Sequence, residues 1–261
     1  MISIIIPTLR VEQKPLALQI TRLLKQNEDF EIIFSDGEKE VFATQYGNLI
    51  SELLMDKGIH CIIVDNPHGH PILTRAESMN LGAKKAQGDI LLFLHMDIFL
   101  PADGLKRIAE TMKNPDVIGG GFLKGYDQPF ACHLTEKLLN YRTTHFKKMV
   151  GTNAIFLRKE VCDANPFPEQ FMEDVALSDQ LIQRYSKRRI AIIPEYVEVS
   201  SIKYRKHGPL KRILINTLIM MLYRAGRVKP SSLENLYKSG RKDSILRVCL
   251  KACQLLWTKG E

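Results

Sequence analysis

Short apolar runs alternate with amphipathic segments through the first hundred residues of the chain. The first run, Ile2–Ile6, is rich in β-branched residues and stops at Pro7, which is typical of a buried strand followed by a loop. Between such runs, apolar residues recur at helical spacing, as at Leu16, Ile20 and Leu23. The expected strands are Ile2–Ile6, Glu31–Phe34, Ile59–Val64 and Ile90–Leu94, and the expected helices are Pro15–Lys25, Ala43–Leu54 and Ala76–Ala86.

This alternation predicts an α/β fold with a Rossmann-like, mostly parallel central sheet that helices cover on both faces. In such sheets, ligands bind at the carboxyl ends of the strands. Polar residues gather where three of the expected strands end, at Pro7-Thr8, at Ser35-Asp36-Gly37 and at His95-Met96-Asp97. The sequence therefore predicts a binding site at this edge of the sheet.

The second half of the chain is less regular, and its strands are expected to be shorter. From Leu210 onward the pattern is helical and basic. The expected strands are Gly119–Leu123, Ala154–Leu157 and Ile190–Ile193, and the expected helices are His133–Lys147 and a segment from Met172 to about Tyr185.

The composition bounds the class of protein. The chain has 261 residues, 45% of them hydrophobic, which suits one large domain or two small ones. Its formal charge of +8 favours anionic partners without choosing among nucleic acid, acidic lipid and phosphorylated substrates. The five cysteines form no C-x-x-C pair, which favours a reducing compartment over a zinc site or a disulfide framework. We see no secretory signal and no apolar run of the ~20 residues that span a bilayer, so we expect a cytoplasmic protein.

Several segments, in the right order, resemble the family 2 glycosyltransferases, whose fold is of the GT-A type. They are Met1–Thr8, Phe34-Ser35-Asp36-Gly37, the stretch from Arg75 to Asp97, and Glu173-Asp174-Val175-Ala176-Leu177-Ser178. The His95-Met96-Asp97 form resembles a bacterial subgroup of the family. The resemblance covers roughly residues 1–205. It implies a catalytic domain over 1–208, with a nucleotide-sugar-binding half at 1–100 and an acceptor half at 101–208, followed by a helical tail at 209–261.

The resemblance implies that Asp97 binds a divalent cation, Mn²⁺ or Mg²⁺. Such a cation takes oxygen ligands, and it stabilises the charge that develops on a leaving nucleoside diphosphate. The alternative is that Asp97 caps a helix beginning near Pro101. Most family members carry Asp where this chain has His95. The imidazole of His95, which we place beside the nucleotide-sugar, could bind the metal or a phosphate, or could only shape the pocket.

The resemblance also implies that Pro7, Thr8, Asp36 and Arg75 contact the nucleotide-sugar. Each has a plainer alternative. Pro7 and Thr8 could simply end a strand, and Asp36 could accept local backbone hydrogen bonds in an Asp-Gly turn. Arg75 could bind phosphate in a bidentate manner or be an ordinary surface arginine.

An inverting sugar transfer needs a base that takes the proton of the acceptor hydroxyl. The resemblance places this role on Asp174, with Glu173 supporting it or contacting the acceptor. The alternative is a common acidic pair at the start of a helix, which the helix dipole favours.

Two later residues are weaker candidates. By resemblance, Tyr204 could touch the diphosphate or the sugar, and His207 could be an extra metal ligand or a solvent-exposed side chain. The segment Gly151-Thr152-Asn153 departs from the subgroup, which more often carries an acidic residue and Gln there. If this segment contacts the acceptor, the acceptor of this protein could differ.

The basic tail has two apolar segments. Leu210–Tyr223, flanked by Lys and Arg, fits a helix that lies on an anionic membrane surface, and equally a packed core helix. Arg241–Trp257 repeats the pattern and could face a membrane or form the subunit contact of a homodimer. The first possibility extends the expected location to the inner face of the plasma membrane.

Together these features predict a metal-dependent, inverting glycosyltransferase (EC 2.4) that moves a sugar from a nucleotide-diphosphate sugar to a glycan or lipid-linked acceptor. One alternative is a catalytically silent nucleotide-sugar-binding protein on the same scaffold. Another is a nucleotidyltransferase, which would normally carry a glycine-rich loop where this chain has Pro7-Thr8-Leu9-Arg10. The chain lacks a basic-aromatic signature, so no nucleic-acid partner is expected.

Overall fold

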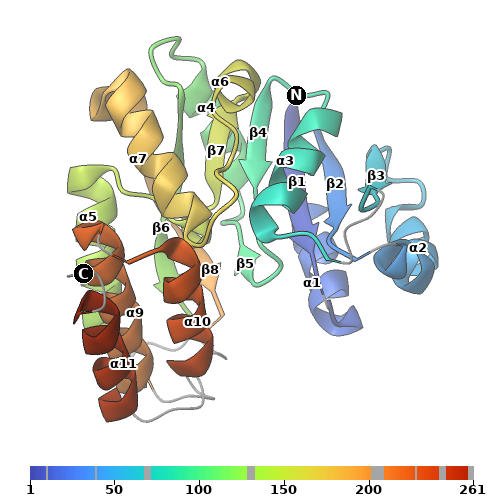
Figure 1. The fold of residues 1–261 in the computed structure, drawn as a ribbon. Coiled ribbons are helices and arrows are strands. Elements are labelled where there is room, and N and C mark those ends of the chain that lie inside the picture. Colours follow the sequence, from blue (N-terminus) through green and yellow to red (C-terminus); the bar gives the residue numbers. More distant parts are fainter. Residues whose placement is uncertain are drawn as a thin grey trace. The chain divides into compact units, whose positions relative to one another are not determined.

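A computed structural model describes residues 1–9, 11–38, 40–67, 72–127, 133–200, 209–226, 228–240 and 245–257. Within these residues, a mixed eight-stranded sheet has the strand order β3-β2-β1-β4-β7-β6-β8-β5 (Figure 1). The strands are β1 (Ile2–Thr8), β2 (Phe30–Asp36), β3 (Cys61–Val64), β4 (Ile90–Phe93), β5 (Ile98–Phe99), β6 (Gly119–Tyr126), β7 (Ile155–Arg158) and β8 (Ile190–Val199). The helices are α1 (Gln13–Leu23), α2 (Val41–Leu54), α3 (Arg75–Lys85), α4 (Gly104–Met112), α5 (His133–Phe146), α6 (Lys159–Ala164), α7 (Glu173–Tyr185), α9 (Pro209–Ala225), α10 (Pro230–Gly240) and α11 (Ile245–Trp257), with 3-10 turns η1 (Gly151–Asn153) and η2 (Lys187–Arg189).

The first half of the chain builds the parallel part of the sheet. β1 pairs in parallel with β2 on one side and β4 on the other, and β2 pairs in parallel with β3. The second half adds antiparallel pairs, namely β4 with β7, β6 with β7, and β5 with β8. The carboxyl ends of β1, β2 and β4 therefore lie side by side, and Thr8 pairs with Asp36 across the first two.

The apolar runs are continuous because both faces of these strands are covered. Ile4, Ile5 and Ile33 are fully buried. On one face, α3, α6 and α7 contribute to a large apolar cluster with the strands, and Figure 1 shows α3 lying across β1 and β2. A Cβ on Gly82 of α3 would lie 2.6 Å from Cγ2 of Ile5, so this glycine lets the helix approach the sheet closely.

Strand β8 is longer than the run Ile190–Ile193 predicts, since it continues through Pro194 to Val199. A proline usually ends a central strand because it cannot donate a ladder hydrogen bond. Here the facing strand β5 pairs only with Glu198 and Val199, so Pro194 has no partner residue in that ladder. The expected strand Gly119–Leu123 likewise extends to Tyr126.

The chain divides into two compact units. The first, Met1–Gly125, Leu138–Glu169 and Glu173–Val199, contains the sheet. The second, Tyr126–Lys137, Gln170–Met172 and Ser200–Glu261, has its own apolar core. That core is formed by helices α9, α10 and α11, with Ile215, Ile219, Leu222, Leu233, Leu236 and Val248 among its members.

Tail helix α9 therefore buries one face against its neighbours α10 and α11, as a packed helix does. Leu214 and Met221 remain exposed on the same helix, and Leu250 is exposed on α11. In the described part of the chain, none of the helices combines the length and the apolar character that crossing a bilayer requires.

Candidate active site

The ends of β1 and β2 form a tight polar turn. The Thr8 hydroxyl donates to the carbonyl of Ser35 at 3.1 Å, and the Gly37 N–H donates to the carbonyl of Thr8 at 2.8 Å. The two carboxylate oxygens of Asp36 accept hydrogen bonds from the N–H groups of Glu38 and Phe42, both at 2.9 Å. This is the local turn chemistry that an Asp-Gly pair predicts. A contact of Pro7, Thr8 or Asp36 with a nucleotide stays a prediction.

Helix α3 begins with a capping box that fixes the position of Arg75. The Thr74 hydroxyl accepts from the N–H of Glu77, and the Glu77 carboxylate accepts from the N–H of Thr74. Arg75, the first residue of the helix, donates through Nε to the carboxylate of Glu173, the first residue of α7. The pair joins two helix starts that lie 98 residues apart in the sequence.

This ion pair is asymmetric in its exposure. The Arg75 side chain is half exposed, whereas that of Glu173 is 6% exposed. Burial raises the pKa of Glu173 and the charge of Asp174 raises it further, while Arg75 opposes both. Burial opposes the charge of Arg75, but the carboxylates of Glu173, Asp174 and Asp97 outweigh it, so the pKa of Arg75 is raised. Arg75 thus lies within electrostatic reach of three carboxylates.

Asp174 is oriented by two backbone N–H groups. Its Oδ2 accepts from Gly151 at 2.6 Å, and its Oδ1 accepts from Val175 at 2.7 Å. Gly151 also touches His95, because a Cβ at position 151 would lie 2.2 Å from Nε2 of His95 and 3.4 Å from Oδ2 of Asp174. The imidazole and the carboxylate therefore approach the same glycine from two elements of the fold.

Five of the predicted site residues are thus brought together: Arg75, His95, Asp97, Glu173 and Asp174. Arg75 is not the ordinary surface arginine of the alternative interpretation, since it is paired with a buried carboxylate. Nor does Asp97 cap the following helix, because α4 begins at Gly104 and its N-cap residue is Asp103. Tyr204 and His207 lie outside the described residues.

Sequence reasoning missed Lys124 of β6. Its side chain is fully buried, and its Nζ donates to the Thr152 hydroxyl at 2.9 Å, one residue from the glycine that holds Asp174. Burial is the main cause that lowers the pKa of Lys124 to about 7, with Arg142 acting in the same direction and Asp174 opposing. A lysine within a strand that otherwise holds glycines and apolar residues is the signal that could have drawn attention to it.

The donor set fits a cation only in part. In the portion of the chain with a described structure, no group of three His, Cys, Asp or Glu side chains forms a complete metal site. Asp97, however, supplies the hard oxygen donor that Mn²⁺ or Mg²⁺ prefers, and Arg75 lies near it as a partner for phosphate. Such residues fit a cation whose other ligands come from a diphosphate and water.

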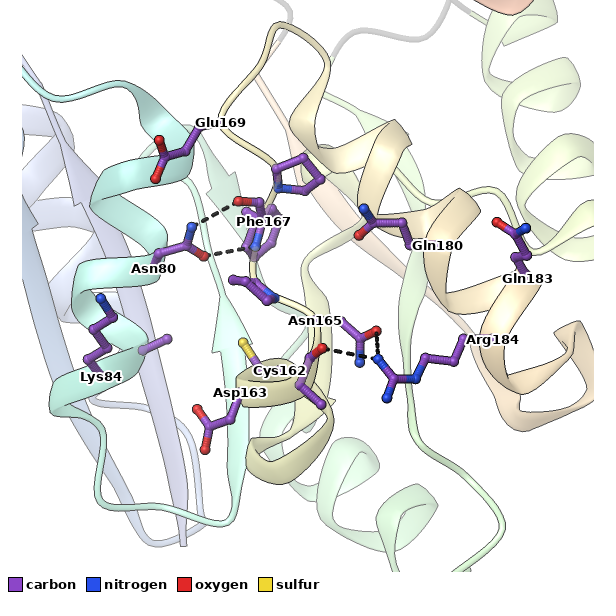
Figure 2. Close-up of a pocket in the computed structure, with 14 residues that line it drawn as sticks. Asn80, Lys84, Cys162, Asp163, Asn165, Phe167, Glu169, Gln180, Gln183 and Arg184 are labelled. Atoms are coloured by element: carbon purple, nitrogen blue, oxygen red, sulfur yellow. Dashed lines mark hydrogen bonds between the residues drawn. The ribbon is translucent and has the colours of Figure 1, made fainter.

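A separate cavity of about 840 Å³ lies between α3, α6 and α7 (Figure 2). The Asn80 side chain closes one part of it by donating to the carbonyl of Phe167 and accepting from its N–H, at 2.9 and 2.8 Å. Arg184 is held on the opposite wall by Asn165, as Figure 2 shows. None of the predicted site residues lines this cavity.

The fold resembles solved glycosyltransferase structures. One is the mannosyltransferase PcManGT from Pyrobaculum calidifontis in complex with GDP-Man and Mn²⁺, at 14% identity and a TM-score of 0.63, covering 98% of this chain and 74% of that one. Another is S. aureus TarS in complex with UDP-GlcNAc, at 19% identity and a TM-score of 0.56, covering 76% of this chain and 58% of that one. This chain therefore spans less than two thirds of that TarS chain. These likenesses confirm the predicted α/β fold of the GT-A type.

The sequence itself carries the family assignment. No curated protein matches it significantly. The model of the Glycosyl transferase family 2 matches residues 3–160, which is more than half of the chain and includes β1, the Asp36 turn, Arg75 and the His95–Asp97 segment. This match confirms the predicted transferase class, and the chain belongs to glycosyl transferase family 2.

Proposed function

We propose that the protein is an inverting, metal-dependent glycosyltransferase that moves a sugar from a nucleotide-diphosphate donor to an acceptor hydroxyl. The observation that carries the proposal is the arrangement of Asp174. Two backbone N–H groups orient its carboxylate at the start of α7, beside the Arg75–Glu173 pair and within the electrostatic neighbourhood that includes Asp97. A base, a phosphate ligand and a metal ligand are therefore supplied by three different elements.

In this mechanism Asp174 accepts the proton of the acceptor hydroxyl as its oxygen bonds to the anomeric carbon of the donor. The bond between that carbon and the diphosphate breaks on the opposite side, so the configuration inverts. Hydrogen bonds from Gly151 and Val175 keep the carboxylate from rotating. Glu173 is held by Arg75, and in this proposal it acts as a positioning carboxylate next to Asp174 in the sequence.

Arg75 and Asp97 serve the donor. Arg75 is half exposed, so its guanidinium can meet a phosphate while it remains paired with Glu173. Asp97 would hold Mn²⁺ or Mg²⁺, which when bound neutralises charge on the leaving diphosphate. His95, beside Gly151, borders the donor sugar or phosphate in this arrangement. Pro7, Thr8 and Asp36 would meet the nucleotide at the neighbouring strand ends, and Tyr204 and His207 would complete the site.

Structures of the same fold support the choice of donor class. Structures of the same fold hold UDP-GlcNAc or GDP-Man, and one of them holds Mn²⁺. We therefore propose a UDP- or GDP-sugar as the donor. The acceptor in this proposal is a glycan or a lipid-linked glycan.

The tail supports a location at an anionic membrane surface. Residues 209–261 contain 11 Lys and Arg against 3 Asp and Glu, whereas residues 1–208 contain 26 of each sign, so the tail carries the whole net charge of +8. Leu214 and Met221, seven residues apart on α9, are exposed on the same face of that helix. A basic segment with exposed apolar residues suits peripheral binding at the inner face of the plasma membrane.

The proposed activity is tested by nucleotide release from a panel of UDP-, GDP- and dTDP-sugars, with Mn²⁺, with Mg²⁺ and with chelator. We expect release from one donor class, dependent on metal and lost in Asp97→Ala. Asp103→Ala, which changes a carboxylate on α4 outside the site, is the matched control. Failure of the whole panel to bind or react, with no difference in Asp97→Ala, would contradict the proposed metal site and leave a scaffold without this activity.

The proposed location has its own test, which does not depend on catalysis. We expect sedimentation with vesicles that contain phosphatidylserine and no sedimentation with vesicles of phosphatidylcholine alone. Equal behaviour with the two vesicle types would contradict binding to an anionic surface.

A further inference from the structure

Lys124 is buried at a position where a charged side chain is energetically unfavourable. It is 1% exposed on β6, and its backbone N–H and carbonyl are both bonded to the side-chain amide of Asn140, at 3.0 and 2.9 Å. Two hydrogen bonds to one amide therefore fix the backbone at this position. Lysine is almost never fully buried without a partner, because removing an ammonium from water costs on the order of several kcal/mol.

The ammonium is joined to the proposed base through a short turn. Nζ of Lys124 donates to the hydroxyl of Thr152, which is the middle residue of η1. The residue before it, Gly151, donates its N–H to Oδ2 of Asp174. The residue after it, Asn153, donates to the carbonyl of Phe122 at 2.7 Å, two residues before Lys124 on the same strand. The turn is thus fastened to β6 at two points and presents Gly151 to Asp174.

The charges around Lys124 come from two helices. Arg142 of α5 repels the ammonium, and Asp174 of α7 attracts it. Burial and Arg142 together outweigh Asp174, so the pKa of Lys124 is lowered to about 7. The ammonium is present below about this pH, and there its nearest favourable charge is the carboxylate of the proposed base.

We propose that Lys124 is a positioning residue for sugar transfer, which holds the η1 turn against Asp174. The inference rests on the proposed function, since it assigns Lys124 a role only through the base Asp174. Lys124 touches neither donor nor acceptor in this scheme. Its contribution is the orientation of the group that accepts the proton.

The proposal separates activity from stability. The folded pKa of Lys124, about 7, lies below the ordinary value of 10.5, so between these two pH values the unfolded chain binds the additional proton. Stability therefore rises with pH across this window, and below about pH 7 the folded state bears the full cost of the buried charge. Lys124→Met removes that cost. A residue kept only for the fold would behave in the opposite way.

The test compares Lys124→Met, Thr152→Val and wild type by donor hydrolysis and thermal unfolding at pH 6. Loss of the bond from Nζ to Thr152 frees the turn that orients Asp174, so Lys124→Met should lower kcat about tenfold with little change in donor KM. Its Tm should equal or exceed that of wild type. Thr152→Val removes the same hydrogen bond from its other end, so it should also lower kcat, by roughly a few fold, with little change in donor KM.

Lys159→Met is the matched control, because Lys159 is a partly buried lysine that donates to the carbonyl of Ala86 and has no contact with Asp174. A wild-type kcat in Lys124→Met, or a loss that appears in donor KM instead of kcat, would overturn the proposal. So would a loss of activity that only follows a loss of folded protein. Absence of nucleotide release from wild type is a different result, since it removes the proposed function itself and with it the role of Lys124.

Discussion

The backbone N–H of Gly151 donates a 2.6 Å hydrogen bond to Oδ2 of Asp174. Gly151 belongs to a 3-10 turn between α5 and β7, and Asp174 is the second residue of α7. This hydrogen bond therefore uses the backbone of the η1 turn to hold the carboxylate at the start of α7. A backbone donor cannot change its rotamer, so the orientation of Asp174 depends on the turn as a whole.

Asp174→Asn should remove the base and leave the shape of the site nearly unchanged. We expect kcat to fall by about 10²- to 10⁴-fold, the usual contribution of a general base, with little change in donor KM. Steady-state kinetics with the donor found in the panel measures both. Asp179→Asn changes a carboxylate further along α7 that pairs with Lys148, and it should keep most of the activity. Similar kcat values for the two variants would argue against Asp174 as the base.

Gly151→Ala should disturb the site by steric overlap, without any change of charge. The new Cβ would lie 2.2 Å from Nε2 of His95, so the imidazole or the turn has to move. We expect a loss of about 1–3 kcal/mol in the free energy of unfolding, typical of overpacking, together with a lower kcat. Urea denaturation and kinetics report the two effects. Gly47→Ala in α2, where a Cβ meets no atom within 4 Å, is the control and should be neutral or slightly stabilising.

Arg75→Met and Glu173→Gln should not have additive effects. Removal of Arg75 leaves the buried carboxylate of Glu173 without its cation, and its already raised pKa should rise further. The double variant leaves neither charge, so it should be more stable than the sum of the single losses predicts, by about 1 kcal/mol. Urea denaturation of all four proteins gives this coupling. Additive losses would mean that the pair contributes nothing beyond its separate residues.

Glu31 makes the fold sensitive to acid at the end of the sheet remote from the site. Burial raises its pKa, but hydrogen bonds from Ser3 at 2.5 Å, Gln87 at 2.6 Å and His60 outweigh this, and the net pKa is lowered. Its ionised form therefore stabilises the fold above the ordinary value of 4.5, and this contribution is lost as the pH falls below it.

Glu31→Gln should cost about 1–3 kcal/mol in the free energy of unfolding at pH 7, because it replaces a charged acceptor in a buried network. It should also show less further loss between pH 5 and pH 3 than wild type. Thermal unfolding across this range is the measurement. An unchanged slope against pH would show that other carboxylates dominate acid unfolding.

The sequence predicted the parallel half of the sheet well, because the apolar runs of β1, β2 and β4 are almost fully buried. Ile2–Ile6 became β1 and Ile90–Leu94 became β4 with small shifts at their ends. The two-residue strand β5 had no such signal. The antiparallel insertion of β7 next to β4 also escaped prediction, since periodicity shows that a segment is a strand but not which strand it pairs with.

The site was predictable as far as its residues follow strands or begin helices. His95 and Asp97 follow β4, and Glu173 and Asp174 begin α7, so topology brings them to one edge. The contact between Arg75 and Glu173 was not predicted, because it joins residues 98 positions apart. Lys124 was not identified from the sequence, because a single lysine in a strand does not reveal the face on which it lies.

The distribution of charge has a consequence for how the protein meets its ligands. Residues 1–208 carry as many acidic as basic side chains, so under the proposed function this part has no net charge that attracts an anionic donor from a distance. Donor capture by this part depends on local groups such as Arg75, whose reach falls within about 10 Å at moderate ionic strength. The tail carries the net charge of +8, and its attraction to an anionic surface is screened over the same distance and weakens as salt rises. We therefore expect added salt to weaken the proposed membrane binding more than the proposed donor binding.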